Sequence, residues 1–372
     1  MPRLNLQTSL CQTFGIQYPV LLAGMADASG PTLTAAVSNA GGLGILGATF
    51  LTPEQIRDWI RKTRTLTSKP FGVDVVFPSG IPVAGETADL TQQVPQRNLE
   101  YVAQLQQRLG VQGAKHLKWE WGLSEAYTRR QMEVVLEEGA PVFASGLGTP
   151  EWVIREAKLH GMTTLSLVGT CRAARRMVAQ GVDVVVAQGY EGGGHTGKVG
   201  ALTLIPQVVD AVHPTPVVAA GGIFDGRGLV AALALGAVGV WLGTAFLATP
   251  EAGVDFIDVG YTNQASLDIW KQAVIRASES DTEVTRLYTG KTARYLKNKL
   301  IDVWEREGTG YLPMPFQALL INPLISSLRE SSLHEYQSGF AGQAAGAIRE
   351  IKPAGQVVAE IVDQAHRILQ EQ

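Results

Sequence analysis

Short apolar segments alternate with longer amphipathic segments along most of this chain. The apolar segments are rich in β-branched and small residues and are continuous rather than alternating with polar positions. That pattern is typical of parallel strands covered by helices on both faces. Eight such segments are predicted to be strands, at residues 19–24, 43–46, 71–76, 141–145, 163–168, 182–187, 216–220 and 238–242.

The segments between these strands have the apolar spacing of helices, and Pro31 and Pro53 are suited to the first turns of two of them. Helices are predicted at residues 32–39, 54–64, 124–138, 151–160, 171–180, 203–212 and 226–235. Eight strand-then-helix units favour a (β/α)₈ TIM barrel, with a doubly wound open sheet as the alternative.

The alternation is interrupted after the third strand by residues 78–122. This stretch is polar and contains several prolines, with a helical run at 96–109 and the aromatic sequence KWEW at 118–121. It is too long for a plain connection. We interpret it as an excursion over the mouth of the barrel that acts as a lid, and a solvated decoration is the alternative.

A second interruption, residues 250–345, separates the eighth strand from a C-terminal helix predicted at 354–369. We expect this interval to be a small, mostly helical subdomain inserted after strand eight. The barrel domain would then comprise residues 1–249 and 346–372, and the terminal helix would close its outer ring.

Glycine-rich loops follow the last two predicted strands. Ala220-Gly221-Gly222 follows strand seven, and Leu242-Gly243-Thr244 ends strand eight and begins the next loop. In TIM barrels these two loops commonly hold a phosphate. Their backbone N–H groups, the Thr244 hydroxyl and the positive end of the helix that begins near Gly226 therefore predict a phosphate site. Ordinary strand-to-helix turns are the alternative.

The other strand ends carry groups suited to a flat polar ring. Gly24 and its neighbours Ala23 and Met25 offer backbone, while Asp74 and Gln188 offer hydrogen bonds. After strand six come three glycines, including Gly193 and Gly194, and then His195. The combination suits a flavin. Taken singly, Asp74 also fits a turn, Gln188 a satisfied core amide and His195 a residue that stabilises its loop.

Composition narrows the classes of function. The formal net charge is −3 and no basic tract occurs, which argues against nucleic acid and anionic membrane surfaces as partners. The two cysteines, Cys11 and Cys171, are far apart and lack metal-type spacing. No apolar run reaches the ~20 residues of a membrane span. We expect a cytoplasmic protein that acts on a small molecule and has no metal site; its oligomeric state is open, with a homodimer as one expectation.

Four stretches carry a resemblance to a known family, and they occur in this order: PVLLAGMADASGPTLTAAVSNAGGLGIL, AQGYEGGGHTG, VVAAGGIFDGRGLVAALALGAVGVWLGTAFL and DTEVTRLYTGKTARYLKN. They resemble the nitronate monooxygenases, formerly called 2-nitropropane dioxygenases. The resemblance implies a TIM barrel that binds FMN non-covalently, with the phosphate on the loops of Gly222 and Gly243-Thr244. It also places the active-site histidine at His195, beside the reactive edge of the flavin.

The activity that this resemblance implies is oxidation of an alkyl nitronate by O₂ to a carbonyl compound and nitrite. His195 would hydrogen-bond the nitro group or deprotonate a neutral nitroalkane. The chain departs from the family pattern at Asp74, where asparagine is usual, in its Gly-Gly-Gly run, where Ala-Gly-Gly is common, and in the length of 78–122. We expect a carboxylate at Asp74 to disfavour an anionic ligand.

Two alternatives remain for the function. An NAD(P)H-dependent FMN reductase acting on a quinone or an enoyl thioester would use the same fold and the same flavin. A phosphate-binding barrel without redox chemistry belongs to a different class, and the purified protein would then lack the yellow colour of a flavoprotein.

Overall fold

An eight-stranded parallel barrel forms the centre of the molecule. The computed structural model describes residues 5–77, 81, 83, 90–111, 124–337 and 339–371. The strands are β1 Val20–Leu22, β2 Gly44–Gly47, β3 Phe71–Asp74, β4 Val142–Ser145, β5 Thr163–Val168, β6 Val184–Gln188, β8 Val217–Ala220 and β9 Gly239–Leu242. They pair in the order β1-β9-β8-β6-β5-β4-β3-β2, and a parallel bridge between Leu21 and Leu43 joins the two ends. The TIM barrel predicted from the alternating pattern is confirmed.

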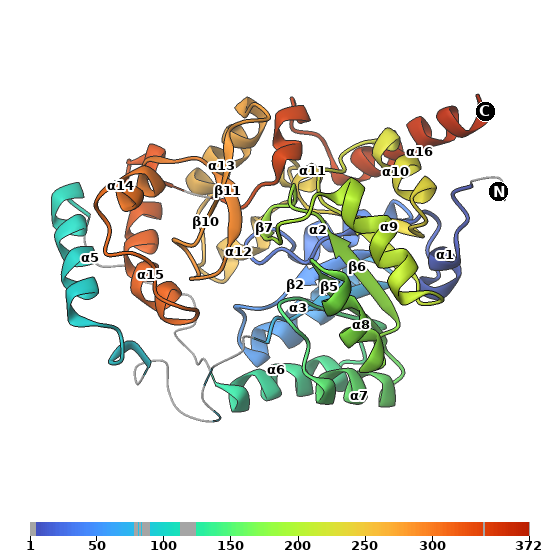
Figure 1. The fold of residues 1–372 in the computed structure, drawn as a ribbon, viewed down its shortest axis with the longest axis horizontal. Coiled ribbons are helices and arrows are strands. Elements are labelled where there is room, and N and C mark those ends of the chain that lie inside the picture. Colours follow the sequence, from blue (N-terminus) through green and yellow to red (C-terminus); the bar gives the residue numbers. More distant parts are fainter. Residues whose placement is uncertain are drawn as a thin grey trace.

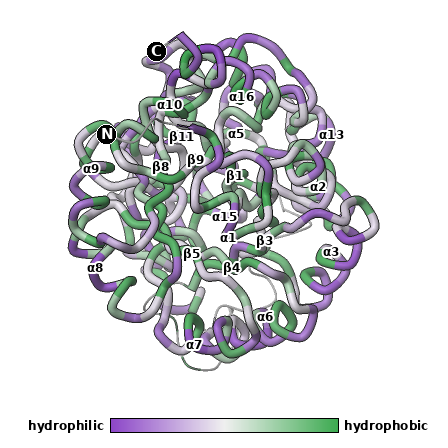
Figure 2. The backbone as a smooth tube through the Cα atoms, turned by 90° about the vertical axis from the view of Figure 1, so that its right-hand side faces the viewer, coloured by the Kyte–Doolittle hydropathy of each residue, from purple (hydrophilic) through white to green (hydrophobic). Residues whose placement is uncertain are grey.

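Helices surround the barrel as a ring, which Figure 2 shows roughly along the barrel axis. They are α2 Pro31–Asn39, α3 Pro53–Leu66, α6 Glu125–Glu137, α7 Glu151–Leu159, α8 Cys171–Ala179, α9 Ala201–Val212, α10 Gly226–Ala234 and α16 Ala354–Gln370. The C-terminal helix α16 packs between α10 and α2, so it fills the eighth place in the ring. Across the described residues, no helix has the length and apolar character that a membrane crossing needs.

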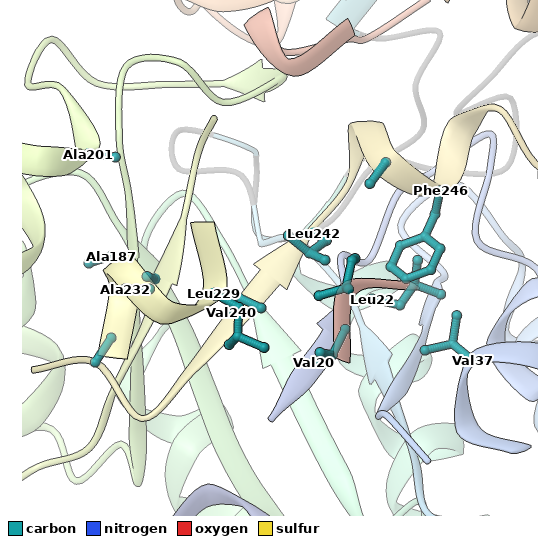
Figure 3. Close-up of a cluster of buried hydrophobic side chains, with 14 of the residues drawn as sticks. Val20, Leu22, Val37, Ala187, Ala201, Leu229, Ala232, Val240, Leu242 and Phe246 are labelled. Carbon is teal, nitrogen blue, oxygen red and sulfur yellow. The ribbon is translucent and has the colours of Figure 1, made fainter. Parts of the chain in front are cut away.

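Alternate residues of each strand supply two different cores. On β1, Leu21 points into the barrel, where it packs with Leu43 and Trp241 and with the short N-terminal helix α1 Ser9–Phe14. Val20 and Leu22 point outward and pack against the helices, in the cluster that also contains Leu242 and Phe246 (Figure 3). Continuous burial of this kind explains why the strands lack a polar face.

The segment between β9 and α16 forms the second part of the molecule, on the left in Figure 1. Its helices are α11 Thr244–Leu247, α12 Val254–Asp258, α13 Gln264–Arg276, α14 Lys299–Glu307 and α15 Phe316–Arg329, with the 3₁₀ turns η1 His334–Tyr336 and η2 Gln343–Ala347. It also contains two strands, β10 Thr282–Thr285 and β11 Ala293–Leu296. They form an antiparallel sheet with β7, Gly194–His195, which belongs to the glycine loop after β6. The helical expectation for this interval did not include that sheet.

No described residue of the predicted excursion lines the cavity described below, and its role as a lid stays a prediction. Helix α5, Gln96–Leu109, packs against α15, on the far side of the inserted segment from the barrel (Figure 1). Its side chains Val102 and Leu105 are buried there with residues of α14 and α15, and none of α5 lines the cavity described below. The rest of the excursion, including the aromatic sequence at 118–121, lies outside the described residues.

Candidate active site

A cavity of about 570 Å³ lies at the carboxyl ends of the barrel strands, where the inserted segment meets the barrel. That volume is within the range usual for small-molecule and cofactor sites. The structure brings almost all of the sequence-predicted site residues to its wall: Ala23, Gly24, Met25, Asp74, Gln188, Gly193, Gly194, His195, Ala220, Gly221, Gly222, Gly243 and Thr244.

Leu242 is the exception among these residues. Its side chain is 1% exposed and points away from the barrel axis into the helix-facing core (Figure 3). Its carbonyl accepts a hydrogen bond of 2.8 Å from the Ala23 N–H. The Leu242 side chain is therefore not part of the wall, because the residues of a strand alternate between its two faces. Its predicted contact with a cofactor stays a prediction.

Close backbone approach explains the glycines after β8 and β9. Gly221 and Gly222 have φ of +97° and +73°, a region that side chains disfavour. A Cβ on Gly221 would lie 3.0 Å from the backbone nitrogen and oxygen of Gly189. After β9, Gly243 has φ of −107°, and a Cβ there would lie 3.3 Å from the Met25 sulfur. The two loops thus bring backbone N–H groups close to the cavity.

We call the loops of Gly221-Gly222 and Gly243-Thr244 the phosphate cradle. The beginning of α10 does not contribute to this cradle, contrary to the sequence expectation. The Asp225 carboxylate accepts hydrogen bonds from the Arg227 and Gly228 N–H groups, at 3.0 and 3.2 Å, and so caps the helix. The Gly226 N–H donates to the Gln364 side chain at 2.8 Å. The free N–H groups that an anion needs at a helix N-terminus are already bonded.

The inserted segment holds the glycine loop after β6 in place. The guanidinium of Arg294, on β11, donates to the Tyr190 carbonyl at 3.1 Å and lies 4.5 Å from the centre of the Tyr190 ring. The Gln343 N–H donates to the Glu191 carbonyl at 3.0 Å. Both contacts join residues that are far apart in the sequence, so the insertion adds to the contacts that hold the loop.

His195, in the glycine loop after β6, also contacts the inserted segment. It pairs with Ala293 of β11, and its Nε2 lies 2.9 Å from the Thr289 hydroxyl. The exposed remainder of the ring faces the cavity. Burial, together with the nearby Lys291 charge, lowers the pKa of His195 to about 4. The imidazole is therefore neutral at physiological pH, which is the form that accepts a proton.

Gln188 and Asp74 lie on the wall in different situations. The Gln188 amide donates 2.8 Å to the His195 carbonyl, so the side chain braces the glycine loop. The Asp74 side chain is 5% exposed, and its Oδ1 has no hydrogen-bond partner among the described residues. Burial raises the pKa of Asp74 well above its usual value. Ser145, which also ends a strand, is fully buried and is not part of the wall.

Several wall residues were not predicted from the sequence, and they come from loops, from α8 and from the insertion. They include Thr49, Thr170, Arg176, Glu191, Trp270, Thr289, Lys291 and Phe340. Phe340 is held by stacking on Tyr295, with ring centroids 4.5 Å apart. The stretch containing Thr289 and Lys291 carries part of the family resemblance, and no site residue was predicted within it. Within the described residues, no cluster of His, Cys, Asp or Glu is arranged to hold a metal ion.

Glu191 offers a direct test of how the loop is anchored. Both of its carboxylate oxygens accept from the Ala201 N–H, at 3.0 and 2.9 Å, at the N-terminus of α9. We expect Glu191→Ala to lower the free energy of unfolding by about 1–2 kcal/mol, because a capping acceptor and a favourable charge are lost. Urea denaturation measures it. The matched control is Glu151→Ala, in the first turn of α7, where the N-cap makes no side-chain bond; an equal loss there would contradict the capping role.

The fold and the strand-end cavity define a TIM-barrel enzyme whose site is completed by an insertion after the last strand. The chain belongs to the nitronate monooxygenase family, an oxidoreductase family, because that family model matches residues 7–364. A probable nitronate monooxygenase of Staphylococcus haemolyticus is 33% identical over 374 residues, which cover 97% of each chain. The family resemblance found in the sequence is confirmed.

Two solved structures share both the fold and the sequence pattern. A nitroalkane oxidase from Streptomyces ansochromogenes is 31% identical, with a TM-score of 0.78, and the match covers 96% of this chain and 99% of that one. FabK from Thermotoga maritima is 32% identical, with a TM-score of 0.74, over 99% of this chain and 98% of that one. Both match the barrel and the insertion together.

Proposed function

We propose that this protein uses FMN to oxidise alkyl nitronates with O₂, and that it also accepts neutral nitroalkanes. Overall, two nitronate anions and one O₂ give two carbonyl compounds and two nitrite ions. The observation that carries the proposal is that a neutral, half-buried histidine and the glycine loops after β8 and β9 line one strand-end cavity. Family membership and the likeness to a nitroalkane oxidase support it.

The residues of the cavity fit FMN. Gly221, Gly222 and Gly243 leave room for a phosphate to approach the backbone, and the Thr244 hydroxyl, which accepts from the Gly342 N–H at 2.8 Å, keeps its own hydrogen to donate. Opposite them, the Oδ1 of Asp74 lacks a protein partner among the described residues. A polar planar ring would satisfy it.

Bound FMN would supply the electron acceptor for the substrate. The chain's own contribution is to orient the substrate and to move one proton. His195 lines the cavity and its Nε2 lies 2.9 Å from the Thr289 hydroxyl, so we assign the proton transfer to the other ring nitrogen. A neutral imidazole in that position accepts the α-proton of a nitroalkane, whereas a preformed nitronate needs no such step.

An NAD(P)H-dependent reductase is the alternative function for the same cavity, and anaerobic mixing separates the two. We expect the flavin spectrum of the purified protein to change on mixing with an alkyl nitronate and to remain unchanged with NADH or NADPH. Stopped-flow absorbance measures all three reactions. Rapid bleaching of the flavin by either nucleotide, with no response to the nitronate, would contradict the monooxygenase function and support the reductase function.

A further inference from the structure

Asp74 is a buried acid on the cavity wall whose Oδ1 has no hydrogen-bond partner among the described residues. It ends β3, and its carboxyl group packs against the backbone of Gly24, where a Cβ would lie 2.3 Å from the Asp74 Cβ. The side chain is 5% exposed, and among the described residues Oδ1 receives no hydrogen bond. An ionised carboxylate left in this state would be strongly unfavourable, because burial removes water without replacing its hydrogen bonds.

No cation in the described structure compensates for this burial. The strands on either side present Gly47 and Ala144 beside Asp74. On the loop after β1, the nearest titratable residue in sequence is Asp27, which is paired with Arg329. The ionisable residues elsewhere on the wall are Arg176, Glu191, His195 and Lys291. Burial is the sole cause that raises the pKa of Asp74, so none of these groups offsets it.

We propose that Asp74 is a protonated carboxylic acid in the working protein and donates a hydrogen bond to an acceptor atom of the bound flavin ring. This inference rests on the proposed function for the identity of the acceptor, but not for the protonation state. It reverses the expectation from the sequence that Asp74 would repel an anionic ligand. A neutral acid adds no negative charge to the cavity, so a nitronate anion is not excluded by it.

The protonated acid and an asparagine are alike in the property that matters here. Both are neutral, both have the same shape, and both can donate a hydrogen bond. They differ in one respect, because the acid loses its proton as the pH rises. Asp74 therefore gives this chain an upper pH limit for binding an anion, which an asparagine at the same position would not give.

The first test reads the protonation state directly and does not depend on activity. We expect the infrared difference spectrum between wild type and Asp74→Asn at pH 7 to contain the carbonyl stretch of a protonated carboxylic acid. The same band should disappear as the pH is raised through the pKa of Asp74. A spectrum at pH 7 that shows only carboxylate bands would overturn the inference.

The second test uses stability in the cofactor-free protein. An acid whose pKa is raised by folding costs no stability below its unfolded pKa of about 3.9 and becomes progressively destabilising above it. The unfolding constant of wild type relative to Asp74→Asn should therefore rise about tenfold per pH unit from about pH 4 until the folded-state pKa is reached. A ratio that does not change with pH would contradict a neutral acid.

The third test addresses the hydrogen bond. We expect Asp74→Leu, which keeps the branching and the number of side-chain heavy atoms but removes the donor, to weaken FMN binding by about 3- to 10-fold relative to Asp74→Asn. Fluorescence titration of the two apoproteins measures it. In parallel, the KM for a nitronate should rise at high pH in wild type and stay flat in Asp74→Asn.

The outcomes separate this inference from the proposed function. A protonated-acid band in a protein that binds no FMN would support the protonation of Asp74 and contradict the proposed nitronate oxidation. FMN binding and nitronate oxidation without that band would support the proposed function and contradict the protonation of Asp74. Equal FMN affinity in Asp74→Asn and Asp74→Leu would contradict the proposed hydrogen bond from residue 74 to the flavin.

Discussion

Replacing Gly243 by valine is expected to abolish FMN binding while leaving the protein folded. The backbone there has φ of −107°, which valine can adopt, so the substitution adds no left-handed strain. The new Cβ would lie 3.3 Å from the Met25 sulfur and 3.5 Å from the Ala23 Cβ, close to but not overlapping them. We expect the two methyl groups to occupy the space through which a phosphate would reach the backbone. Gly222 is less suitable for this test. Its φ is +73°, so a valine there would strain the backbone as well as block the approach of a phosphate.

Denaturation of the purified variant, followed by chromatography of the supernatant, measures bound FMN, and circular dichroism measures the fold. The matched control is Gly355→Val on α16, where a Cβ would meet only Ala40, at 3.8 Å, on the outside of the barrel. We expect full FMN content in the control and none in Gly243→Val. FMN retained in both variants would show that the phosphate does not bind at the loop after β9. Release of FAD from wild type would refute FMN as the cofactor.

The barrel could be predicted from the sequence because its signals are local. The strands are mostly apolar runs, and several helices have a start signal. One is Thr52, whose hydroxyl accepts from the Gln55 N–H at 3.2 Å while the Gln55 side chain accepts from the Thr52 N–H. The ends of parallel strands meet at one edge. Residues such as Gly24, Asp74 and Gly221 therefore converge without any knowledge of the tertiary contacts.

The sheet of β7, β10 and β11 could not be predicted in the same way. Its strands are short, and the pairing of Gly194 with Arg294 joins segments that are far apart in the sequence. Nothing near either residue indicates the other. For the same reason the wall residues Thr289, Lys291 and Phe340 were missed, since they reach the cavity only through this sheet and the loop before η2.

The error at α10 had a different origin. Asp225 immediately precedes Gly226, and aspartate is among the preferred N-cap residues. A helix that carries its own carboxylate cap is a poor anion site, so the sequence contained the signal against that placement. The phosphate cradle proposed here therefore relies on Gly221, Gly222, Gly243 and Thr244 alone.

His195→Asn is expected to retain FMN and to lose activity selectively on neutral nitroalkanes. Asparagine keeps a polar side chain on β7 but cannot accept the α-proton of the substrate. Loss of a general base typically costs roughly 10²–10⁴-fold in rate, or about 3–5 kcal/mol. The rate on the matching preformed nitronate should fall much less, because that anion has already lost the proton.

Steady-state oxygen consumption with the two forms of one nitroalkane gives the ratio of kcat/KM values. The matched control is His160→Asn, an exposed histidine after α7 whose ring nitrogen contacts only its own helix, and we expect that ratio to be unchanged there. An equal loss on nitroalkane and nitronate in His195→Asn would show that His195 binds the nitro group or shapes the loop rather than acting as a base.

The pH profile distinguishes the base further. Burial and the Lys291 charge lower the pKa of His195 to about 4, so the ring stays neutral down to that pH and becomes protonated below it. The wild-type rate on a neutral nitroalkane should accordingly persist through pH 6.5, the usual pKa of histidine, and decline only as the pH approaches about 4. Removing the positive charge with Lys291→Met should move this decline to higher pH, because protonation of the ring is then less costly. A decline centred near pH 6.5 in wild type would show that the ring in the working enzyme is solvated, and that its buried setting between Thr289 and β11 does not control its basicity.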